Sequence, residues 1–343
     1  MQRPSTILFI VLDAFPHDLV DRDLTPTLFA LAAEGGWARD GGRGILSAAT
    51  YPNHATFITG VGPGEHGVYT NRAWSAEGKR PAQEVGPRAS TLFEECRAAG
   101  LKTAAAFGDQ NLVGVCGAEK ADVHWPPKGI LPAGAPKGKL GYGADRAVIQ
   151  GLDTLDLAGA DFVFLQLDEV DTARHLSGPF GDAVLEQCRA TDSALAEILE
   201  RFRSEWDDTL AIVVSDHDHE AVEPGAVDLA AEATARGLDI EIDHEGTAAL
   251  VVGEVSDARL LELPGVAGAT GLAPGFKLVW GPPGQQFGID WGLAAQHGSP
   301  RTLKQLAVVG GGHPAARAIA AEVEASPPSG LSWAGWMRHW LAL

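Results

Sequence analysis

The stretch Ile7–Leu12, with the sequence ILFIVL, runs directly into Asp13. FVFLQL at Phe162–Leu167 and LAIVV at Leu210–Val214 end in the same way, with an acidic residue one or two positions further on. These runs are rich in Val, Ile, Leu and Phe and nearly continuous, which is typical of strands in a sheet covered on both faces. Ligands bind beyond the carboxyl ends of such strands, so the three acidic ends are expected to meet at one edge of the sheet.

Further apolar runs predict four more strands, at Thr103–Phe107, Ala248–Val252, Lys277–Trp280 and Leu306–Val309. The segments between the runs carry helix signals. Thr25-Pro26 begins a helix that Gly35 ends, Ser90 or Thr91 caps a helix that ends near Ala99, and a long helix fills Gly181–Arg203. Strands that alternate with helices predict an α/β fold with a doubly wound, mostly parallel central sheet and helices on both faces.

The 343 residues fit one large domain or two modest ones. Because no convincing boundary divides the chain, a single catalytic domain spanning residues 1–343 is expected, with two regions outside the regular pattern. Residues 108–146 contain many Gly and Pro residues, which predicts a lid-like loop, and a plain surface loop is an equally good interpretation. Residues 253–297 are similarly rich in Gly and Pro and are expected to form a small excursion from the domain.

The charge and cysteine content exclude several classes of protein. The chain has 26 Lys+Arg against 45 Asp+Glu, a net charge of −19, which argues against binding long nucleic acids or a membrane surface. Three distant cysteines give neither a disulfide framework nor a thiolate metal site. No apolar stretch reaches the length of a membrane span, so a cytoplasmic protein without a membrane partner is expected.

Two acidic strand ends also carry histidine. Asp171 and His175, in DTARH, are four residues apart, which places both on one face of a helix. Asp216 and His217 follow the strand 210–214, where the chain turns and both side chains can enter a cleft. Carboxylate and neutral imidazole are ligands that suit Zn²⁺. Asp-His pairs also occur by chance on exposed helices, so this pattern alone is a weak signal.

The segment around Thr50 offers a nucleophile. Pro52 favours an extended Tyr51 and can begin a helix that Gly60 ends, so Thr50 is expected just before a helix N-terminus, where a phosphate is favoured. A threonine hydroxyl needs a base or a metal ion to become nucleophilic. Taken by itself, Thr50 is more simply interpreted as a helix cap.

The segment TYPNHATFITGVGPGEHGVYTN, residues 50–71, resembles the nucleophile segment of nucleotide pyrophosphatase/phosphodiesterases in the alkaline phosphatase superfamily. The strand ending in Asp13, TPTLFALAAEG, DTARHLSGP, SDHD and a late HGSP follow in the order of that family. The resemblance covers roughly residues 5–310 and implies an alkaline phosphatase-like fold.

This resemblance also implies a set of site residues. One zinc ion would be held by Asp171, His175 and His297, and a second by Asp13, Asp216 and His217 together with the Thr50 oxygen; other divalent ions could replace zinc. Asn71 would bind a non-bridging phosphate oxygen. The glycine usual after the Asp-His pair is Asp218 here, followed by His219, and either residue could support the site or compete for a metal ion.

The function implied is that of a metal-dependent phosphodiesterase or nucleotide pyrophosphatase that forms a phosphothreonine intermediate on Thr50 and acts on a small phosphoester such as a nucleotide. A phosphomonoesterase or a phosphonoacetate hydrolase-like enzyme on the same site is the main alternative. Those substrates need added cations, which Arg72, Lys128, Lys137 and Lys139 could supply. A non-catalytic metal-binding protein is a further alternative, which the full ligand set disfavours.

Overall fold

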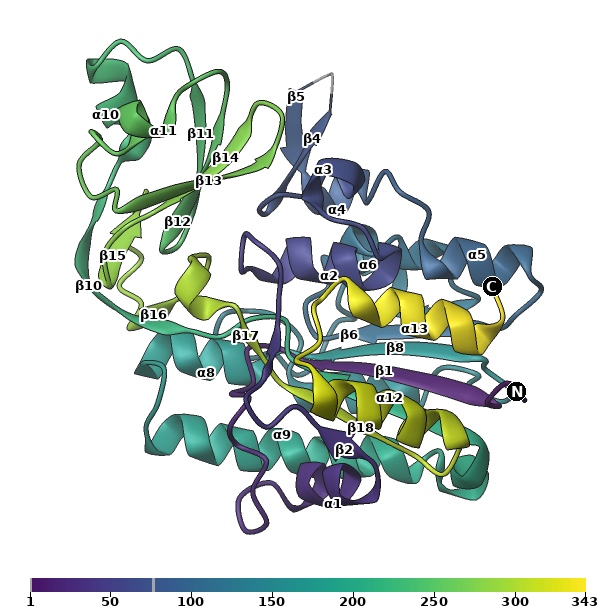
Figure 1. Ribbon diagram of the computed structural model, residues 1–343. Helices are drawn as coiled ribbons and strands as arrows, with labels where there is room; N and C mark the ends of the chain where they lie inside the picture. The colour runs from purple at the N-terminus through teal and green to yellow at the C-terminus, as the bar shows by residue number, and fades with distance from the viewer. Residues whose placement is uncertain (1, 76–77) are drawn as a thin grey trace.

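Strand β1 (Thr6–Leu12) is the middle strand of a seven-stranded sheet in the computed structural model of the chain, which describes residues 2–75 and 78–343 (Figure 1). The strand order is β2-β18-β9-β1-β8-β6-β7. The other strands are β2 (Gly36–Trp37), β6 (Thr103–Phe107), β7 (Val123–Trp125), β8 (Phe162–Leu167), β9 (Thr209–Val214) and β18 (Ala307–Gly310). Strand β18 is antiparallel to both neighbours, and β9, β1, β8, β6 and β7 are parallel. The predicted mostly parallel sheet is therefore confirmed.

The register of the three middle strands brings their carboxyl ends together. Leu12 of β1 lies opposite Leu167 of β8, and Val11 lies opposite Val214 of β9. Beyond this pairing, the N–H of Asp13 donates to the Leu167 carbonyl at 2.9 Å. The acidic residues that follow these strands consequently lie at one edge of the sheet.

Helices cover both faces of this sheet because alternate side chains of β1 enter two different cores. Ile7, Phe9 and Val11 pack with apolar residues of α2, α5, α6, α12 and α13. Leu8, Ile10 and Leu12 pack with α1, α7 and α9 on the opposite face. In Figure 1, α1 and α9 lie below the sheet while α2 and α5 lie above it. A strand buried on both sides has no polar face, which explains the continuous apolar run.

The helix ends read from the sequence agree with the structure in three places. Helix α1 spans Pro26–Glu34, α5 spans Leu92–Ala98 and α9 spans Asp182–Glu200. The cap of α5 is Thr91, whose hydroxyl accepts from the Glu94 N–H while the Glu94 carboxylate accepts from the Thr91 N–H, which completes a capping box.

The start of α2 differs from the prediction. Helix α2 spans Thr50–Thr59, with Ala49 as its N-cap, so it begins at Thr50 rather than at Pro52. Tyr51 is therefore helical and not extended. Pro52 is tolerated because the first N–H groups of a helix have no partner within the helix in any case. Gly60 ends α2 with φ 74°, as the sequence predicts.

The remaining helices are α3 (Pro63–His66), α4 (Ala82–Val85), α6 (Leu112–Val115), α7 (Asp145–Leu152), α8 (Glu169–Ser177), α10 (Leu229–Ala235), α11 (Asp257–Leu260), α12 (Pro314–Ala325) and α13 (Ser332–Leu341). Short 3₁₀ turns lie at Ala118–Lys120, Pro127–Gly129, Arg203–Asp208 and Pro300–Thr302. Within the described ranges, none of the helices has both the length and the apolar character needed to cross a membrane.

A second, antiparallel sheet stands apart from the central one, at the upper left of Figure 1. Its order is β11-β12-β14-β13, with β11 (Glu241–Glu245), β12 (Ala248–Val252), β13 (Gly268–Ala273) and β14 (Phe276–Trp280). Two runs that the sequence assigned to the parallel sheet, Ala248–Val252 and Lys277–Trp280, lie here instead. Val251 packs toward α10, whereas Leu250 packs against Tyr69 and Trp74. This sheet is also covered on both faces, so its runs look like those of the central sheet.

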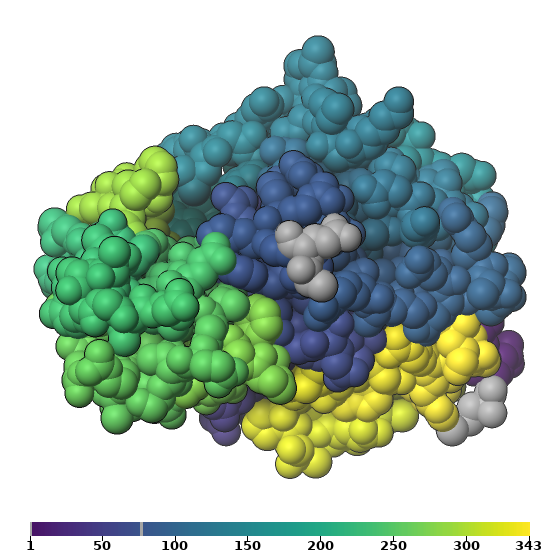
Figure 2. All heavy atoms as spheres, turned by 90° about the horizontal axis from the view of Figure 1, so that it is seen from above, coloured from purple at the N-terminus to yellow at the C-terminus, as the bar shows by residue number. Residues whose placement is uncertain are grey.

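Several short strand pairs lie outside the central sheet and the small sheet. Strands β4 (Arg72–Ser75) and β5 (Gly78–Pro81) form a hairpin, β10 (Glu220–Val227) pairs with β15 (Gly284–Phe287) and β16 (Ala295–Gln296), and β3 (Gly42–Arg43) pairs with β17 (Lys304–Gln305). Figure 2 shows the small sheet, in green, beside the blue β4–β5 hairpin. The ring of Tyr69, just before this hairpin, stacks on Phe276 of β14 with 4.3 Å between centroids.

The two Gly/Pro-rich regions contain regular structure. Residues 108–146 include α6 and the edge strand β7, so only their later part, up to α7, runs as an extended loop. Residues 253–297 contribute β13 and β14 to the small sheet and then continue into β15 and β16. A lid function of the first region stays a prediction.

Candidate active site

The side chains predicted to hold metal ions converge beyond the carboxyl edge of the central sheet. They come from the loop after β1 (Asp13), the first residue of α2 (Thr50), helix α8 (Asp171 and His175), the loop after β9 (Asp216 and His217) and the turn after β16 (His297). All are buried apart from Thr50, which is half-buried. The structure thus brings residues together that lie up to 284 positions apart, from Asp13 to His297.

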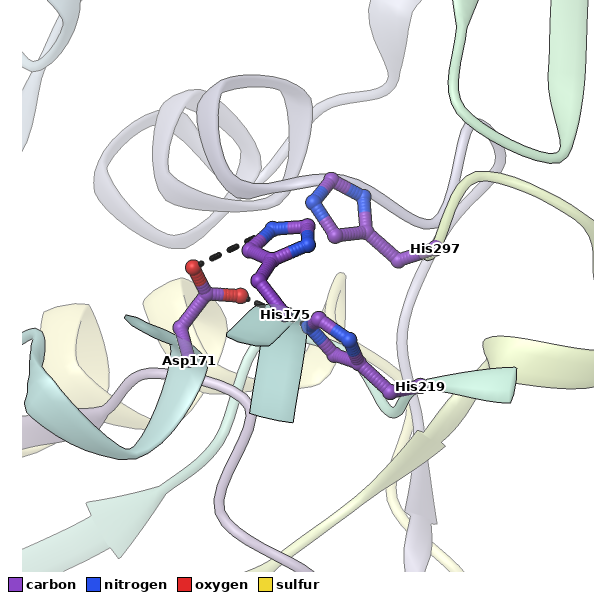
Figure 3. Close-up of side chains that lie close together, drawn as sticks. All are labelled: Asp171, His175, His219 and His297. Atoms are coloured by element: carbon purple, nitrogen blue, oxygen red, sulfur yellow. Dashed lines mark hydrogen bonds and ion pairs between the residues drawn. The ribbon is translucent and has the colours of Figure 1, made fainter. Parts of the chain in front are cut away.

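One group, the Asp171 cluster, consists of Asp171, His175, His219 and His297 (Figure 3). Each residue offers one donor atom, and these atoms all lie within 4.8 Å of one another. His175 Nε2 is 3.4 Å from one Asp171 oxygen, as expected for residues four apart on α8. The other ring nitrogen of His175, Nδ1, is 2.9 Å from the Ala295 carbonyl, an arrangement that directs Nε2 toward the cluster.

His219, which the sequence analysis left as a residue that could support the site or compete for a metal ion, belongs to this cluster. Its Nε2 lies 2.7 Å from Asp171, and the side chain is buried. The signal that could have found it is its spacing from His217. In extended chain, residues two apart point to the same side, and the rings of His217 and His219 are 5.6 Å apart.

A second group, the Asp13 cluster, consists of Asp13, Thr50, Asp216 and His217. His217 Nε2 lies 3.5 Å from an oxygen of Asp13, 3.5 Å from an oxygen of Asp216 and 3.1 Å from the Thr50 hydroxyl. The Thr50 hydroxyl, the two carboxylates and the imidazole therefore lie close enough together to surround one common position.

Two oxygens of the Asp13 cluster have no hydrogen-bond donor. Asp13 Oδ1 and Asp216 Oδ2 are buried and lack a partner among the residues that the structure describes. Burial, with the nearby charges of Asp216 and Asp171, raises the pKa of Asp13 well above its usual value. A bare buried carboxylate oxygen is costly unless a cation faces it. A divalent ion fits this arrangement.

Burial favours the neutral imidazole, which is the form that binds a metal ion, at three histidines of the two clusters. Burial lowers the pKa values of His217, His219 and His297 well below the usual range, and the charge of neighbouring His175 adds to this in each case. Nitrogen and oxygen donors without thiolate match the preferences of Zn²⁺. The donor set therefore fits the metal ions that the sequence implied.

Asn53 and His54, which are also in α2, hold the backbone around Thr50 in place through hydrogen bonds. His54 Nδ1 donates to the Thr50 carbonyl at 2.9 Å and lies 3.5 Å from Asp216. Because Nδ1 donates its proton to this carbonyl, His54 positions the backbone of Thr50. Asn53 Nδ2 donates to the Ala49 carbonyl at 2.9 Å and holds the start of the helix.

Gln166 and Arg174 hold the clusters in place and were not identified from the sequence. Gln166 Nε2 donates to Asp13 Oδ2 at 2.7 Å, and its Oε1 accepts from the Asp109 N–H at 3.0 Å. The fully buried Arg174 donates to the Ala14 carbonyl at 2.6 Å and to Asp218 at 2.5 Å. Asp218 is therefore engaged by an arginine, not by the candidate metal positions.

A cavity of about 600 Å³ opens in front of the clusters. Its lining residues include Thr50, Tyr51, Asn71, Arg72, Asp109, Leu140, Tyr142, Asp168, Asp171, His175, Asp243, His244, Glu245, Phe287, Ile289, Trp291 and His297. The small sheet and the segment that follows it, in which Trp291 is 71% exposed, supply one wall. Residues 140–142 of the loop before α7 supply another.

Asn71 lies on the wall of this cavity rather than in either cluster. Its side chain is exposed, and its N–H donates to the Glu245 carboxylate at 3.1 Å. Burial, with a smaller contribution from Asp243, raises the pKa of Glu245 to about 8. The link from Glu245 to Asn71 fixes the backbone that presents the Asn71 side chain to the cavity.

Comparisons with known proteins concern the family and the fold of the chain. A family model described as type I phosphodiesterase / nucleotide pyrophosphatase matches residues 7–261. Ectonucleotide pyrophosphatase/phosphodiesterase family member 3 of Mus musculus is 26% identical over 196 residues, covering 51% of this chain. The chain spans only 20% of the length of that relative.

Solved structures share the fold at low sequence identity. Human ectonucleotide pyrophosphatase/phosphodiesterase 5 has a TM-score of 0.74 at 13% identity, covering 98% of this chain and 95% of its own. An inactive variant of the murine protein in complex with AMP has a TM-score of 0.71 at 14% identity, covering 100% and 96%. Phosphonoacetate hydrolase from Sinorhizobium meliloti, in complex with phosphonoformate, has a TM-score of 0.69 at 15% identity, covering 99% and 96%. These likenesses establish an alkaline phosphatase-like fold.

Proposed function

The chain belongs to the type I phosphodiesterase / nucleotide pyrophosphatase family, and from this membership and the site geometry we propose that it is a metal-dependent phosphodiesterase or nucleotide pyrophosphatase with Thr50 as nucleophile. The observation that carries the proposal is the position of the Thr50 hydroxyl, 3.1 Å from His217 Nε2 and at the start of α2. A hydroxyl in that place faces both the Asp13 cluster and the positive end of a helix dipole.

Two zinc ions are proposed to occupy the site. Asp171, His175 and His297 would hold one ion. Asp13, Asp216 and His217, together with the Thr50 oxygen, would hold the other. Bound there, such ions supply charge that lowers the pKa of the Thr50 hydroxyl and stabilises negative oxygens around phosphorus.

The proposed reaction has two chemical steps, in which first the Thr50 oxygen and then water attack phosphorus. The Thr50 hydroxyl gives its proton to water and its oxygen attacks phosphorus, and the bond from phosphorus to the leaving oxygen breaks as the new bond forms. The leaving group takes up a proton from water. Water then attacks the phosphorylated Thr50, which releases the product and returns a proton to the Thr50 oxygen. Each of the two steps is a displacement at phosphorus, so every turnover includes two displacements.

Substrate oxygens have two sets of donors near Thr50. The free N–H groups at the N-terminus of α2 favour an anion. The amide of Asn71, on the cavity wall, is proposed to donate to a non-bridging oxygen. A small nucleotide-sized phosphoester is the proposed substrate class, because the cavity of about 600 Å³ lies within the range of small-ligand pockets.

The charge of the cavity favours a diester over the alternatives. Carboxyl groups of Asp109, Asp168, Asp243 and Glu245 line it, whereas Arg72 is the one arginine or lysine among the described residues of its lining. Of the four cations considered as partners for extra negative charge, Arg72 lines the cavity, whereas Lys128, Lys137 and Lys139 are not among the lining residues. A phosphomonoester or carboxylated phosphonate carries more negative charge than a diester, and among the described lining residues only Arg72 offers a cationic side chain to pair with it.

The test is a set of rates on matched aryl phosphodiester, phosphomonoester, phosphonate and sulfate substrates, measured together with metal content. The proposal expects the diester to be hydrolysed fastest, activity to be lost on chelation, and zinc to restore it. A diester rate far below the other three would show that the assigned substrate class is wrong. Full activity in metal-free protein would refute the metal-dependent mechanism.

A further inference from the structure

We propose that His219 is a fourth protein ligand of the ion assigned to Asp171, His175 and His297. The proposal rests on the metal site of the proposed function and adds to it one residue and a coordination state. It makes the two metal positions unequal, because the fourth protein ligand of one is an imidazole and the fourth protein ligand of the other is the reactive Thr50 hydroxyl.

The geometry of the Asp171 cluster places His219 as an equal member. The ring of His219 lies 4.4 Å from that of His175 and 5.2 Å from that of His297, measured between centroids. Figure 3 shows the three rings and the Asp171 carboxylate arranged around a common space. The donor atoms of all four residues lie within 4.8 Å of one another, so no member is peripheral.

Hydrogen bonds alone do not satisfy this arrangement. Asp171 has two oxygens, of which one faces His175 Nε2 at 3.4 Å and the other faces His219 Nε2 at 2.7 Å. The third imidazole, His297, has a buried Nδ1 without a hydrogen-bond partner among the residues that the structure describes. Three imidazoles and one carboxylate are a donor set of three nitrogens and one oxygen. Four such donors match the tetrahedral shell that zinc prefers.

The chain is built to hold His219 at this point. The carboxylate of Asp218 accepts from the His219 N–H at 2.8 Å and also from Arg174 at 2.5 Å. Arg174 is itself on α8, between Asp171 and His175, and is fully buried. The ion pair between Arg174 and Asp218 therefore ties the backbone of His219 to the helix that carries two other ligands. Glycine at position 218 could not form this link.

A filled tetrahedral shell has a consequence for the ion. Structural zinc sites have four protein ligands, whereas catalytic sites usually have three and keep a position open. The ion of the Asp171 cluster, with its four non-reacting ligands, is thus expected to bind more tightly than the ion of the Asp13 cluster, whose fourth protein ligand is the Thr50 hydroxyl that reacts. It is also expected to exchange more slowly. Substrate would reach it only by an increase in coordination number.

The experiment counts the imidazoles on each ion. The full chain is loaded with cadmium, and a proton–cadmium correlation spectrum records which histidine ring protons couple to each cadmium. The expected spectrum has one cadmium coupled to three histidines and one coupled to a single histidine. In His219→Gln, one of the three couplings disappears while the other two remain.

Zinc affinity supplies a second readout, measured by competition with a chromophoric chelator. His219→Gln is expected to weaken the tighter ion by at least about tenfold and to leave the weaker ion unchanged. The matched control is His339→Gln, at an exposed histidine in α13, which should alter neither the couplings nor the affinities.

The outcomes separate this proposal from the proposed function. A wild-type spectrum with only two histidines on the first cadmium overturns the role of His219, whether or not the variant folds, and leaves the three-ligand site intact. Failure of the chain to bind cadmium or zinc at all overturns both proposals.

Discussion

Arg174 Nη2 lies 2.5 Å from the carboxylate of Asp218, and this ion pair joins helix α8 to the loop after β9. Arg174 Nη1 also donates to the carbonyl of Ala14, in the loop after β1. One guanidinium therefore links the ends of the segments that carry Asp13, Asp171 and Asp216. Because the Arg174 side chain has 0% exposure, its positive charge is stabilised by these protein acceptors and not by solvent.

Replacement of Asp218 should test how much stability this link provides. Asp218→Ala leaves the buried charge of Arg174 without its carboxylate, which is expected to lower the free energy of unfolding by about 3–5 kcal/mol. Denaturant titration of the metal-free proteins measures the change. The matched control is Glu197→Ala, which breaks the exposed pair with Arg146 and should cost less than about 1 kcal/mol. Equal costs for the two variants would show that the buried pair has no special role.

Removal of Gln166 should weaken metal binding without removing a ligand. Gln166 orients Asp13 through the 2.7 Å hydrogen bond, so Gln166→Leu is expected to reduce zinc affinity roughly 10- to 100-fold. Competition with a chelator measures this. Gln305→Leu is the control, because Gln305 is equally buried but accepts from Trp333 instead. An unchanged zinc affinity in Gln166→Leu would contradict the orienting role.

His66 should make the protein sensitive to acid. Burial, and then the charge of Arg88, lowers the pKa of His66 from 6.5 to about 3. The unfolded chain binds a proton on His66 below about pH 6.5, but the folded chain does so only below about pH 3. The free energy of unfolding is thus retained above pH 6.5 and falls as the pH is lowered toward 3, by up to roughly 1.4 kcal/mol per pH unit.

The variant His66→Gln removes this titration. Its free energy of unfolding should fall less steeply with decreasing pH than that of the wild type, with the difference in slope largest between about pH 4 and 6. Gln can replace the hydrogen bonds of His66 with the Thr56 hydroxyl and the Val68 N–H. Parallel curves for the two proteins would mean that His66 does not carry the acid sensitivity.

Thr50→Ala should abolish turnover while the metal ions stay bound. The carboxylates and imidazoles of both clusters remain, so the metal content should be nearly that of the wild type, whereas the rate should fall at least about a thousandfold. Thr59→Ala, at the other end of α2, removes a hydroxyl that donates to the Ala55 carbonyl and should preserve the rate. A Thr50→Ala protein with near-normal turnover would overturn the nucleophile assignment.

The sequence was sufficient for five of the seven strands of the central sheet, all but β2 and β7, and for the meeting of its acidic ends. Ile7–Leu12, Phe162–Leu167 and Leu210–Val214 are each buried on both sides, so their apolar runs are long and continuous. The pairing of parallel strands then places the following residues at one edge, because register determines where each strand ends. The spacing of Asp171 and His175 likewise predicted a shared helix face.

Other features depend on contacts that local patterns do not contain. The apolar run Ala248–Val252 forms part of the small sheet, and its second face is covered by Tyr69 and Trp74, which are distant in sequence. The hydrogen bond from Gln166 to Asp13 joins neighbouring strands, and a glutamine within an apolar strand was the only local sign of it. The role of Arg174 required the position of Asp218, which only the folded chain provides.

The stereochemistry at phosphorus tests the central claim most directly. A phosphorothioate diester of known configuration is hydrolysed by the zinc-loaded protein in water labelled with heavy oxygen, and the configuration of the product is determined. Attack by Thr50 followed by attack of water inverts phosphorus twice, so the account predicts net retention. Net inversion would mean that water attacks the substrate directly, and it would contradict a covalent intermediate on Thr50.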